Sequence, residues 1–181
     1  MKKSVIMILL VLIILSSCRS YIDIPRNSIS KDYLIFKYEN DYNNFIFSDK
    51  VNIVADKDVS ITTHFNIRLP KKIIYWMRLG NRFFFEYSTG QLICVYSSYA
   101  NKEGHGDEWK LFEPKENDEF NYLDEYFEKK VKGNKRKNRK AGRITKVYTN
   151  SKYEILLYNI KKENFDSFYD FVKSFKVIPR K

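Results

Sequence analysis

The amino-acid sequence predicts an α+β domain in which a mostly antiparallel sheet packs against two main helices. Short runs rich in β-branched and aromatic residues follow one another between Asp32 and Ser98, separated by clusters of Asn and Asp. Two later segments place apolar residues at helical intervals, and two further strand-like runs lie between them. The order of strands, helix, hairpin and helix is typical of domains whose helices cover an antiparallel sheet.

The strand pattern is clearest in residues 59–70, VSITTHFNIRLP. Apolar and polar residues alternate along this segment, so we expect one half-buried strand that stops at Pro70. Residues 82–88 and 91–98 are joined through Thr89–Gly90, as expected of a hairpin. Three shorter β-rich runs precede these, at 32–38, 44–48 and 51–55.

The first predicted helix spans residues 118–133. Asn117 or Asp118 is expected to cap its start, and Gly133 is expected to end it. Its acids precede its bases, an order that suits the helix dipole. Its apolar stripe consists of Phe120, Leu123, Phe127 and Val131.

The last predicted helix spans residues 164–175, with Asn164 as its cap. Between the two helices, residues 143–149 and 152–160 are expected to form two strands hinged at Asn150–Ser151. The apolar face of the last helix consists of Phe165, Phe168, Phe171, Val172 and Phe175.

The N-terminus has the features of a secretory signal. Lys2 and Lys3 precede an unbroken apolar run, Val5–Leu15. An eleven-residue helix rises roughly 16 Å, at about 1.5 Å per residue, and cannot cross a hydrocarbon core of about 30 Å. The run is therefore predicted to be the apolar core of a signal peptide and not a membrane span.

The sequence Leu15-Ser16-Ser17-Cys18 resembles the lipobox of bacterial lipoproteins. The resemblance implies cleavage before Cys18 and acylation of its sulfur, and more than one acyl chain anchors a protein stably. The alternative is a plain signal peptide with an incidental cysteine. With lipidation, we expect a lipid-anchored protein of the cell envelope, on the periplasmic side of a bacterial membrane, with the outer membrane favoured. The predicted organisation is signal peptide 1–17, lipidated N-terminus and flexible tether 18–31, and a single domain 32–181.

The order of elements also resembles a known fold family. The segment FNIRLP, the hairpin FFFEYSTGQLICVYSS, the middle helix and the stretch KYEILLYNIKKENFDSFYDFVKSFKVI are similar in pattern to the Mog1p/PsbP-like α/β sandwich. The similarity covers roughly residues 55–178. It implies a central antiparallel sheet followed by a C-terminal helix, and a binding or accessory role without a cofactor.

The positive charge of the chain is concentrated in one segment, residues 129–146. Of the 33 bases, two lie in the signal peptide and ten in this segment, which leaves 21 bases against 22 acids elsewhere. The candidate residues for contact with an anionic surface are Lys132, Lys135, Arg136, Lys137, Arg139, Lys140 and Arg143.

The composition of this basic segment bears on its partner. No aromatic residue lies between Lys132 and Arg143, whereas single-stranded nucleic acid is usually bound by bases interleaved with aromatic platforms. A nucleic-acid partner is therefore disfavoured, and an anionic lipid, lipopolysaccharide or envelope protein is expected instead. The alternative is a solvated connector between a helix and the next strand.

One loop carries candidate metal ligands. His105 and Asp107 lie close to further acids in EGHGDEW, and such side chains bind hard cations or zinc. No second histidine or known ligand spacing accompanies them, so a solvated hairpin loop is the favoured interpretation. The other histidine, His64, is expected on the polar face of its strand.

The sequence nominates no catalytic residue, because it has neither a G-x-S-x-G elbow nor a glycine-rich phosphate motif. Adjacent acids such as Asp124 and Glu125 point about 100° apart on a helix and cannot flank a scissile bond. Cys94, Trp76 and Trp109 are expected in the core. We therefore expect a non-enzymatic binding or accessory module. The alternative is an envelope hydrolase or a metal-dependent protein.

Overall fold

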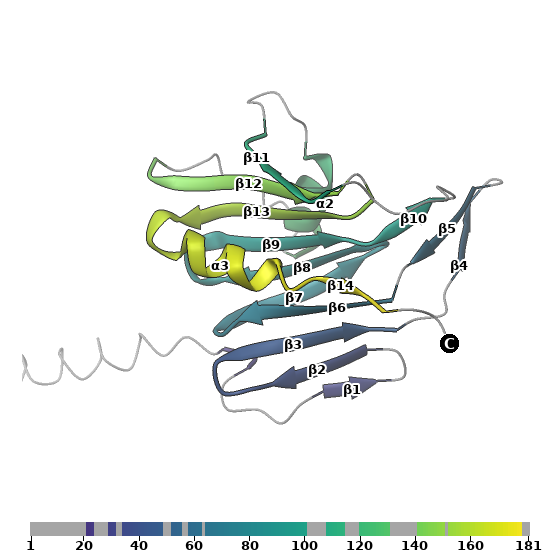
Figure 1. Cartoon of the computed structure of the whole chain (residues 1–181), viewed down its shortest axis with the longest axis horizontal. Coiled ribbons are helices and arrows are strands. Elements are labelled where there is room, and N and C mark those ends of the chain that lie inside the picture. Colours follow the sequence, from purple (N-terminus) through teal and green to yellow (C-terminus); the bar gives the residue numbers. More distant parts are fainter. Residues whose placement is uncertain are drawn as a thin grey trace, which may run out of the picture.

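Within the residues that the structure describes, three antiparallel sheets and two α-helices build the fold of this computed structural model (Figure 1). The predicted α+β class is confirmed, with strands dominating. The described residues are 21–23, 29–31, 34–48, 52–55, 58–62, 64–100, 108–114, 120–130, 141–150 and 152–178.

Each sheet is antiparallel throughout. The strands of the five-stranded and three-stranded sheets lie in chain order, whereas β9 and β13 are neighbours in the six-stranded sheet although they are not consecutive in the chain. The five-stranded sheet consists, from edge to edge, of β1 (Ile29–Lys31), β2 (Leu34–Tyr38), β3 (Tyr42–Phe47), β6 (Phe65–Pro70) and β14 (Lys176–Val177). The six-stranded sheet consists of β11 (Lys110–Phe112), β12 (Arg143–Thr149), β13 (Glu154–Lys161), β9 (Gln91–Tyr96), β8 (Arg82–Tyr87) and β7 (Ile73–Leu79). The three-stranded sheet consists of β10 (Ser98–Ala100), β5 (Asp58–Thr62) and β4 (Asn52–Ala55).

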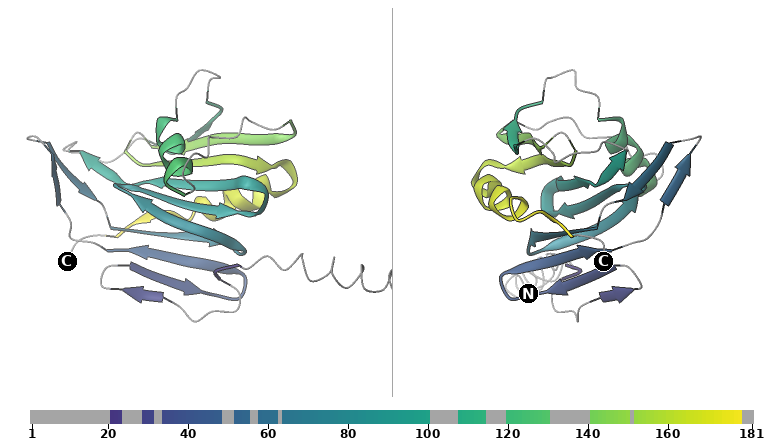
Figure 2. Two further views of the ribbon diagram at one scale, coloured as in Figure 1. Left: turned by 180° about the vertical axis from the view of Figure 1, so that it is seen from behind. Right: turned by 45° about the vertical axis from the view of Figure 1, so that its right-hand side comes forward.

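The six-stranded sheet is the middle layer of the domain. Its two faces are covered differently, since α3 (Phe165–Val172) lies on one side and α2 (Asn121–Lys130) on the other (Figure 2). Side chains along β8 alternate between two separate clusters. Phe83 and Phe85 pack with the five-stranded sheet and α3, whereas Phe84 packs with α2.

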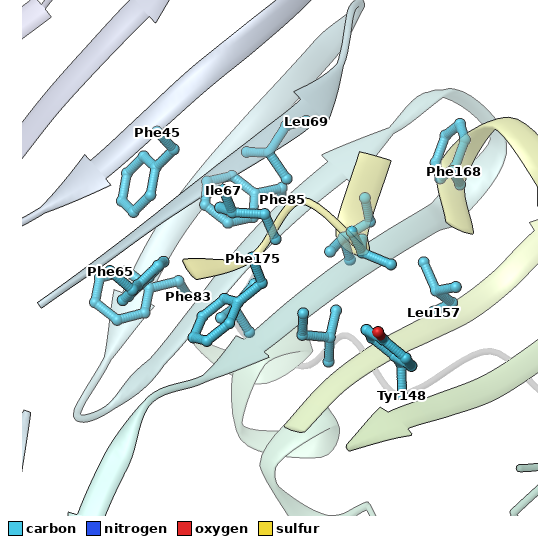
Figure 3. Packing of buried hydrophobic residues seen from close by; sticks show 14 of the residues in the cluster. Phe45, Phe65, Ile67, Leu69, Phe83, Phe85, Tyr148, Leu157, Phe168 and Phe175 are labelled. Carbon is cyan, nitrogen blue, oxygen red and sulfur yellow. The ribbon is translucent and has the colours of Figure 1, made fainter. Parts of the chain in front are cut away.

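Aromatic rings fill the space between the five-stranded sheet and the middle layer (Figure 3). The ring of Phe45 lies 5.0 Å from that of Phe85, and the ring of Phe47 lies 4.7 Å from that of Phe83. Such pairs stabilise by about 0.5–1.5 kcal/mol beyond the burial of their area. They hold the β7–β8 hairpin against the five-stranded sheet.

A second cluster attaches α2 to the opposite face of the middle layer. Tyr126 is fully buried, and its ring stacks on that of Phe84 with centroids 4.6 Å apart. The Tyr126 hydroxyl donates a 2.6 Å hydrogen bond to Glu86, and Lys130 forms an ion pair with the same carboxylate. Burial and the neighbouring Glu86 raise the pKa of Tyr126. The helix is therefore held by polar contacts as well as by apolar packing.

The prediction of one continuous strand over residues 59–70 is wrong. The segment divides into β5, which pairs with β4 and β10, and β6, which pairs with β3 and β14. Because the two parts join different sheets, the chain cannot continue as one strand. The predicted alternation holds within β6, where Phe65, Ile67 and Leu69 are buried and Arg68 is exposed.

The first predicted helix is shorter in the described residues, where α2 begins at Asn121 and ends at Lys130. Leu123 is buried as predicted, but Tyr126 and not Phe127 completes the buried face. The expected caps at Asn117 or Asp118 and at Gly133 lie outside the described residues.

The last predicted helix is confirmed in its position and in most of its apolar face. Phe165, Phe168 and Val172 are buried in α3, and Phe175 is buried just after the helix ends. Asn164 occupies the N-cap position, but its side chain forms no capping bond and donates instead to Gln91.

Both predicted hairpin connections are confirmed. Ser88–Gly90 joins β8 to β9 through a short 3-10 turn in which Thr89 and Gly90 have positive φ, at 64° and 74°. Asn150 joins β12 to β13, and its side-chain oxygen accepts hydrogen bonds from the backbone N–H groups of Lys152 and Tyr153. This side-chain bonding is the turn-forming property expected of asparagine.

Parts of the predicted tether 18–31 belong to the folded structure. Ile29–Lys31 forms β1 and pairs with β2, and Ile22 packs against the core. Asp23 is almost completely buried. The polar composition of residues 18–31 suggested a tether. It could not reveal these contacts, because their partners lie on other elements of the fold.

Candidate anion-binding site

A depression of about 500 Å³ lies beside the turn between β7 and β8, and it is open to solvent. The turn itself is formed by Gly80 and Asn81, and Gly80 has a φ of 55°, a left-handed conformation that glycine adopts without strain. The lining residues come from the adjoining ends of β7 and β8, from their turn, from β9 and from α2. They are Arg78, Leu79, Gly80, Asn81, Arg82, Tyr96, Glu125 and Lys129.

Arg82 is held in place by two aromatic rings from different elements. The central carbon of its guanidinium lies 4.6 Å from the ring centroid of Tyr96, on β9, and 4.5 Å from that of Tyr122, on α2. Both distances are within the range of cation–π attraction. The Tyr122 hydroxyl in turn donates a 3.3 Å hydrogen bond to Glu154. The guanidinium is therefore positioned before any ligand arrives.

Arg78 is held in a similar way on the other side of the hairpin. Its guanidinium carbon lies 4.8 Å from the ring centroid of Phe47 and 5.6 Å from that of Phe83. Its Nε atom donates a 2.8 Å hydrogen bond to the carbonyl oxygen of Gly80. The same aromatic core that fixes the hairpin thus also positions this cation.

The lining of the depression has an excess of positive charge. Three of its side chains are cationic and one, Glu125, is anionic. Glu125 and Lys129 form an ion pair of 2.7 Å, but both side chains are more than half exposed, at 53% and 55%. Such pairs contribute little to stability and rearrange readily. The ring partners of Arg78 lie on the five-stranded-sheet side of the hairpin, whereas those of Arg82 include Tyr122 on α2, so the two guanidinium groups face opposite sides. The positioned guanidinium of Arg82 and the exposed ammonium of Lys129, which both come from the lining on the α2 side, suit an anion such as a phosphate or carboxylate.

A half-buried carboxyl group, that of Glu154, lies next to the residues that hold Arg82. Glu154 accepts the hydrogen bond of Tyr122, and burial raises its pKa. That hydrogen bond and the charge of Arg82 oppose the rise without cancelling it. When ionised, Glu154 therefore partly offsets the positive electrostatic potential of Arg82.

Other chemistry has less support from the described residues. No group of three His, Cys, Asp or Glu side chains in that part of the chain is placed to hold a metal ion. Cys94 is 2% exposed, as predicted for a core residue, and burial raises the pKa of its thiol. Trp76 and Trp109 are partly buried and pack against the core, which also matches the prediction. Among the described residues, no helix combines the length and apolar character needed to cross a membrane.

Most of the residues proposed from the sequence lie outside the described part of the chain. Of that set, the structure places Arg143, which begins β12 and lies at the other end of the sheet from the depression. Its Nη1 atom is 3.4 Å from the Thr89 hydroxyl and 3.5 Å from the carbonyl oxygen of Asn159. The residues outside the described part are Cys18, His105, Asp107, Lys132, Lys135, Arg136, Lys137, Arg139 and Lys140.

The ends of the basic segment contact their own domain. Lys129 pairs with Glu125, and Lys130 pairs with Glu86. The Lys146 ammonium lies 5.5 Å from the ring centroid of Phe165. These bases therefore contribute to the packing of the domain as well as to its charge.

Arg78 and Arg82 were not predicted as functional residues, although the sequence contains a signal for them. An arginine lies on each side of Gly80–Asn81, and the flanking runs are apolar and strand-like. A two-residue turn at this point brings both arginines to one end of a sheet. The two rings that hold Arg82 come from β9 and α2, and that juxtaposition depends on the tertiary fold.

Comparisons of the chain with protein-family models, with curated proteins and with solved structures returned no match.

Proposed function

We propose that this protein is a lipid-anchored cell-envelope lipoprotein whose domain binds an anionic group in the depression beside the β7–β8 turn. The observation that carries this function is the guanidinium group of Arg82, which two aromatic rings hold at the lining of the depression, near the exposed Lys129. Positioned cations lose little side-chain entropy when a ligand binds, so they favour recognition of a charged group. The role is binding or accessory rather than catalytic.

The proposed fold family is the Mog1p/PsbP-like α/β sandwich. Its support is the antiparallel six-stranded sheet, which has α2 on one face and the C-terminal α3 on the other. Strands β1 to β3 precede the region of resemblance and widen the five-stranded sheet on the α3 side. The family implies accessory or binding roles, which is consistent with an open depression lined by cations.

The basic segment is proposed as a second contact with anionic envelope components such as lipid or lipopolysaccharide. Its support is its composition, together with the position of its two ends. Lys130 pairs with Glu86, next to the β8–β9 turn, and Arg143 contacts Thr89 in that same turn. Lys130 and Arg143 therefore both contact residues near the β8–β9 turn, whereas Lys129, the first residue of the segment, lines the depression.

Binding of inorganic phosphate tests the depression. We expect the backbone amide signals of Gly80 and Asn81 to shift on titration, and Arg82→Gln to weaken the affinity about tenfold, since a hydrogen bond to a charged group contributes about 1.5–3 kcal/mol. Lys129→Gln should weaken it less. Lys110→Gln is the matched control, because Lys110 is exposed and lies outside the depression. Amide signals that stay unmoved, or equal affinities for all variants, contradict the proposal.

The lipid anchor is tested by Cys18→Ser. This change removes the thioether that the acyl chains require, so we expect the protein to leave the membrane fraction and to lose incorporation of labelled palmitate. Cys94→Ser is the matched control, because Cys94 is buried in the core. Retention of the Cys18→Ser protein in washed membranes would contradict the lipoprotein proposal.

A further inference from the structure

The chain is fixed to the domain within a few residues of the predicted lipid. The backbone N–H of Ile22 donates a 2.8 Å hydrogen bond to the carbonyl oxygen of Ile73. One carboxylate oxygen of Asp23 accepts bonds of 2.7 Å from the Asn43 side chain and 2.8 Å from the Lys72 backbone. The other carboxylate oxygen, Oδ1, has no hydrogen-bond partner among the described residues. The two bonds to Oδ2, the Ile22 backbone bond and the packing of Ile22 against the core together hold the N-terminal chain in one place.

The strand register shows which end of the domain carries this contact. Ile73 is the first residue of β7 and pairs with Tyr87, the last residue of β8. Tyr87 pairs with Gln91, and Arg143 pairs with Lys161 at the same end of the sheet. We call this the anchor end, and it consists of Tyr21–Asp23, Tyr38–Tyr42, Pro70–Ile73, Tyr87–Gln91, Ala141–Arg143 and Asn159–Asn164.

The depression lies at the opposite end of the same strands. Arg82 begins β8 and pairs with Leu79 at the end of β7 and with Tyr96 at the end of β9. From Arg82 to Tyr87 the strand advances roughly 17 Å, at about 3.3 Å per residue. Figure 1 shows this arrangement, with the β7–β8 turn and the start of β7 at opposite ends of the sheet.

The reach of the predicted anchor is short. Three residues lead from Cys18 to Tyr21, and three residues span at most about 11 Å when fully extended. That is less than the length of β8. An acyl chain on Cys18 therefore excludes an orientation with the depression end against the bilayer and the anchor end away from it, while Asp23 stays in its buried position.

We infer that the lipid anchor holds the domain end-on, with the anchor end against the membrane and the depression facing the aqueous space. The inference rests on the proposed lipidation of Cys18. It also restricts where the proposed anionic ligand can come from. The depression takes an anionic group from a soluble or opposing envelope component, and the head groups of the anchoring bilayer are out of its reach.

In neutral vesicles the orientation depends on the length of the connection and not on charge. In the described residues of the anchor end, five bases (Lys71, Lys72, Arg143, Lys161 and Lys162) accompany four acids (Asp23, Glu39, Asp41 and Glu163). This near balance gives these residues little attraction of their own to an anionic bilayer. Neutral vesicles also lack the anionic lipid that the basic segment is proposed to contact, so they isolate the effect of the short connection.

Energy transfer from a labelled protein to the membrane surface tests the inference. The full-length lipidated protein carries a donor dye at Lys162→Cys, on the anchor end, or at Lys110→Cys, whose neighbours pair toward the depression end. Vesicles of phosphatidylcholine carry the acceptor on their head groups. Both lysines are exposed, and the buried Cys94 is shielded from the dye. We expect at least about twofold more transfer from position 162, because roughly 20 Å of strand separates the two ends.

The outcomes are distinct. If the protein floats with the vesicles but energy transfer is equal from both positions, or greater from position 110, the end-on orientation is wrong. The lipoprotein proposal is not affected by that result. Protein that does not float with the vesicles overturns both. Phosphate binding to the depression is measured separately, so its loss overturns only the proposed ligand site.

Asp23→Ala provides a second measurement on the same samples. The change removes an acceptor of two hydrogen bonds, so the N-terminal chain detaches and the transfer ratio falls toward one while flotation persists. Asp41→Ala is the matched control, since Asp41 is an exposed acid on the same end. An unchanged ratio in a folded Asp23→Ala protein overturns the role of this contact, and the unfolding temperature reports whether that variant is folded.

Discussion

At the scale of single residues, the positions of the two arginines depend on neighbours distant in sequence. Arg82 lies between rings of Tyr96 and Tyr122, and Arg78 lies over rings of Phe47 and Phe83. Burial of core residues such as Cys94 was predictable, because it follows from local strand patterns. The composition of the depression was not, because it depends on which helix face meets which strand end.

Glu154 gives a pH-dependent prediction. Burial raises the pKa of this carboxyl above its ordinary value of 4.5, so the folded protein binds its proton more tightly than the unfolded chain does. The stability that it contributes is therefore present at low pH and is lost as the pH rises through the raised pKa. Relative to the unchanged protein, Glu154→Gln should be more stable at pH 7 than at pH 4. Urea unfolding at both pH values measures this difference.

The control for this prediction is Glu128→Gln, which removes an exposed carboxyl group on α2. We expect its effect on the free energy of unfolding to be the same at both pH values. If Glu154→Gln also shifts stability equally at pH 4 and pH 7, the buried carboxyl does not titrate as described.

At the scale of elements, local sequence patterns predicted the type and order of the helices and strands. They predicted less well where each element begins and ends and which strands pair with each other. The final helix and the two hairpins were predictable because each depends on nearby residues, such as Gly90 and Asn150 in the turns. The division of residues 59–70 between two sheets was not, because alternation is the same whichever sheet a strand joins. The buried face of α2 turned out to include Tyr126, whose hydroxyl needed a partner on β8.

The attachment of α2 to the middle layer is testable with one change. Leu123 is fully buried against this layer, so Leu123→Ala should lower the free energy of unfolding by about 2–5 kcal/mol. Glu128→Ala on the exposed face of the same helix should change it by less than about 0.5 kcal/mol. Chemical denaturation measures both. Similar small effects for the two variants would mean that α2 is not packed as described.

At the scale of the whole molecule, the concentration of positive charge along the chain was predictable. The arrangement of the two ends of the domain in space was not. The sequence places ten bases in residues 129–146 and leaves the rest nearly neutral. The arrangement of the anchor end opposite the depression required the strand register, which joins residues such as Ile73, Tyr87 and Gln91 across three strands.

The basic segment makes a prediction about the unanchored protein. On the Cys18→Ser background, changing Lys135, Arg136, Lys137, Arg139 and Lys140 to Gln should weaken binding to anionic vesicles at low salt. Each base near an anionic surface contributes about 1 kcal/mol at best, and salt screens this attraction. Vesicle sedimentation at low and high salt measures the effect. If the proteins with and without these five changes bind equally at low salt, the segment does not contact anionic lipid and is a solvated connector.

The pairing of β14 with β6 has a consequence for the order in which the protein can fold. Lys176 lies opposite Asn66, its partner 110 positions earlier in the chain. The backbone N–H of Ile178 also bonds to the carbonyl oxygen of His64. Pairings of such long range form late, because closing a long loop is entropically costly. For a chain exported with its N-terminus first, as proposed, β14 is added to this sheet only after nearly all of the chain has crossed the membrane.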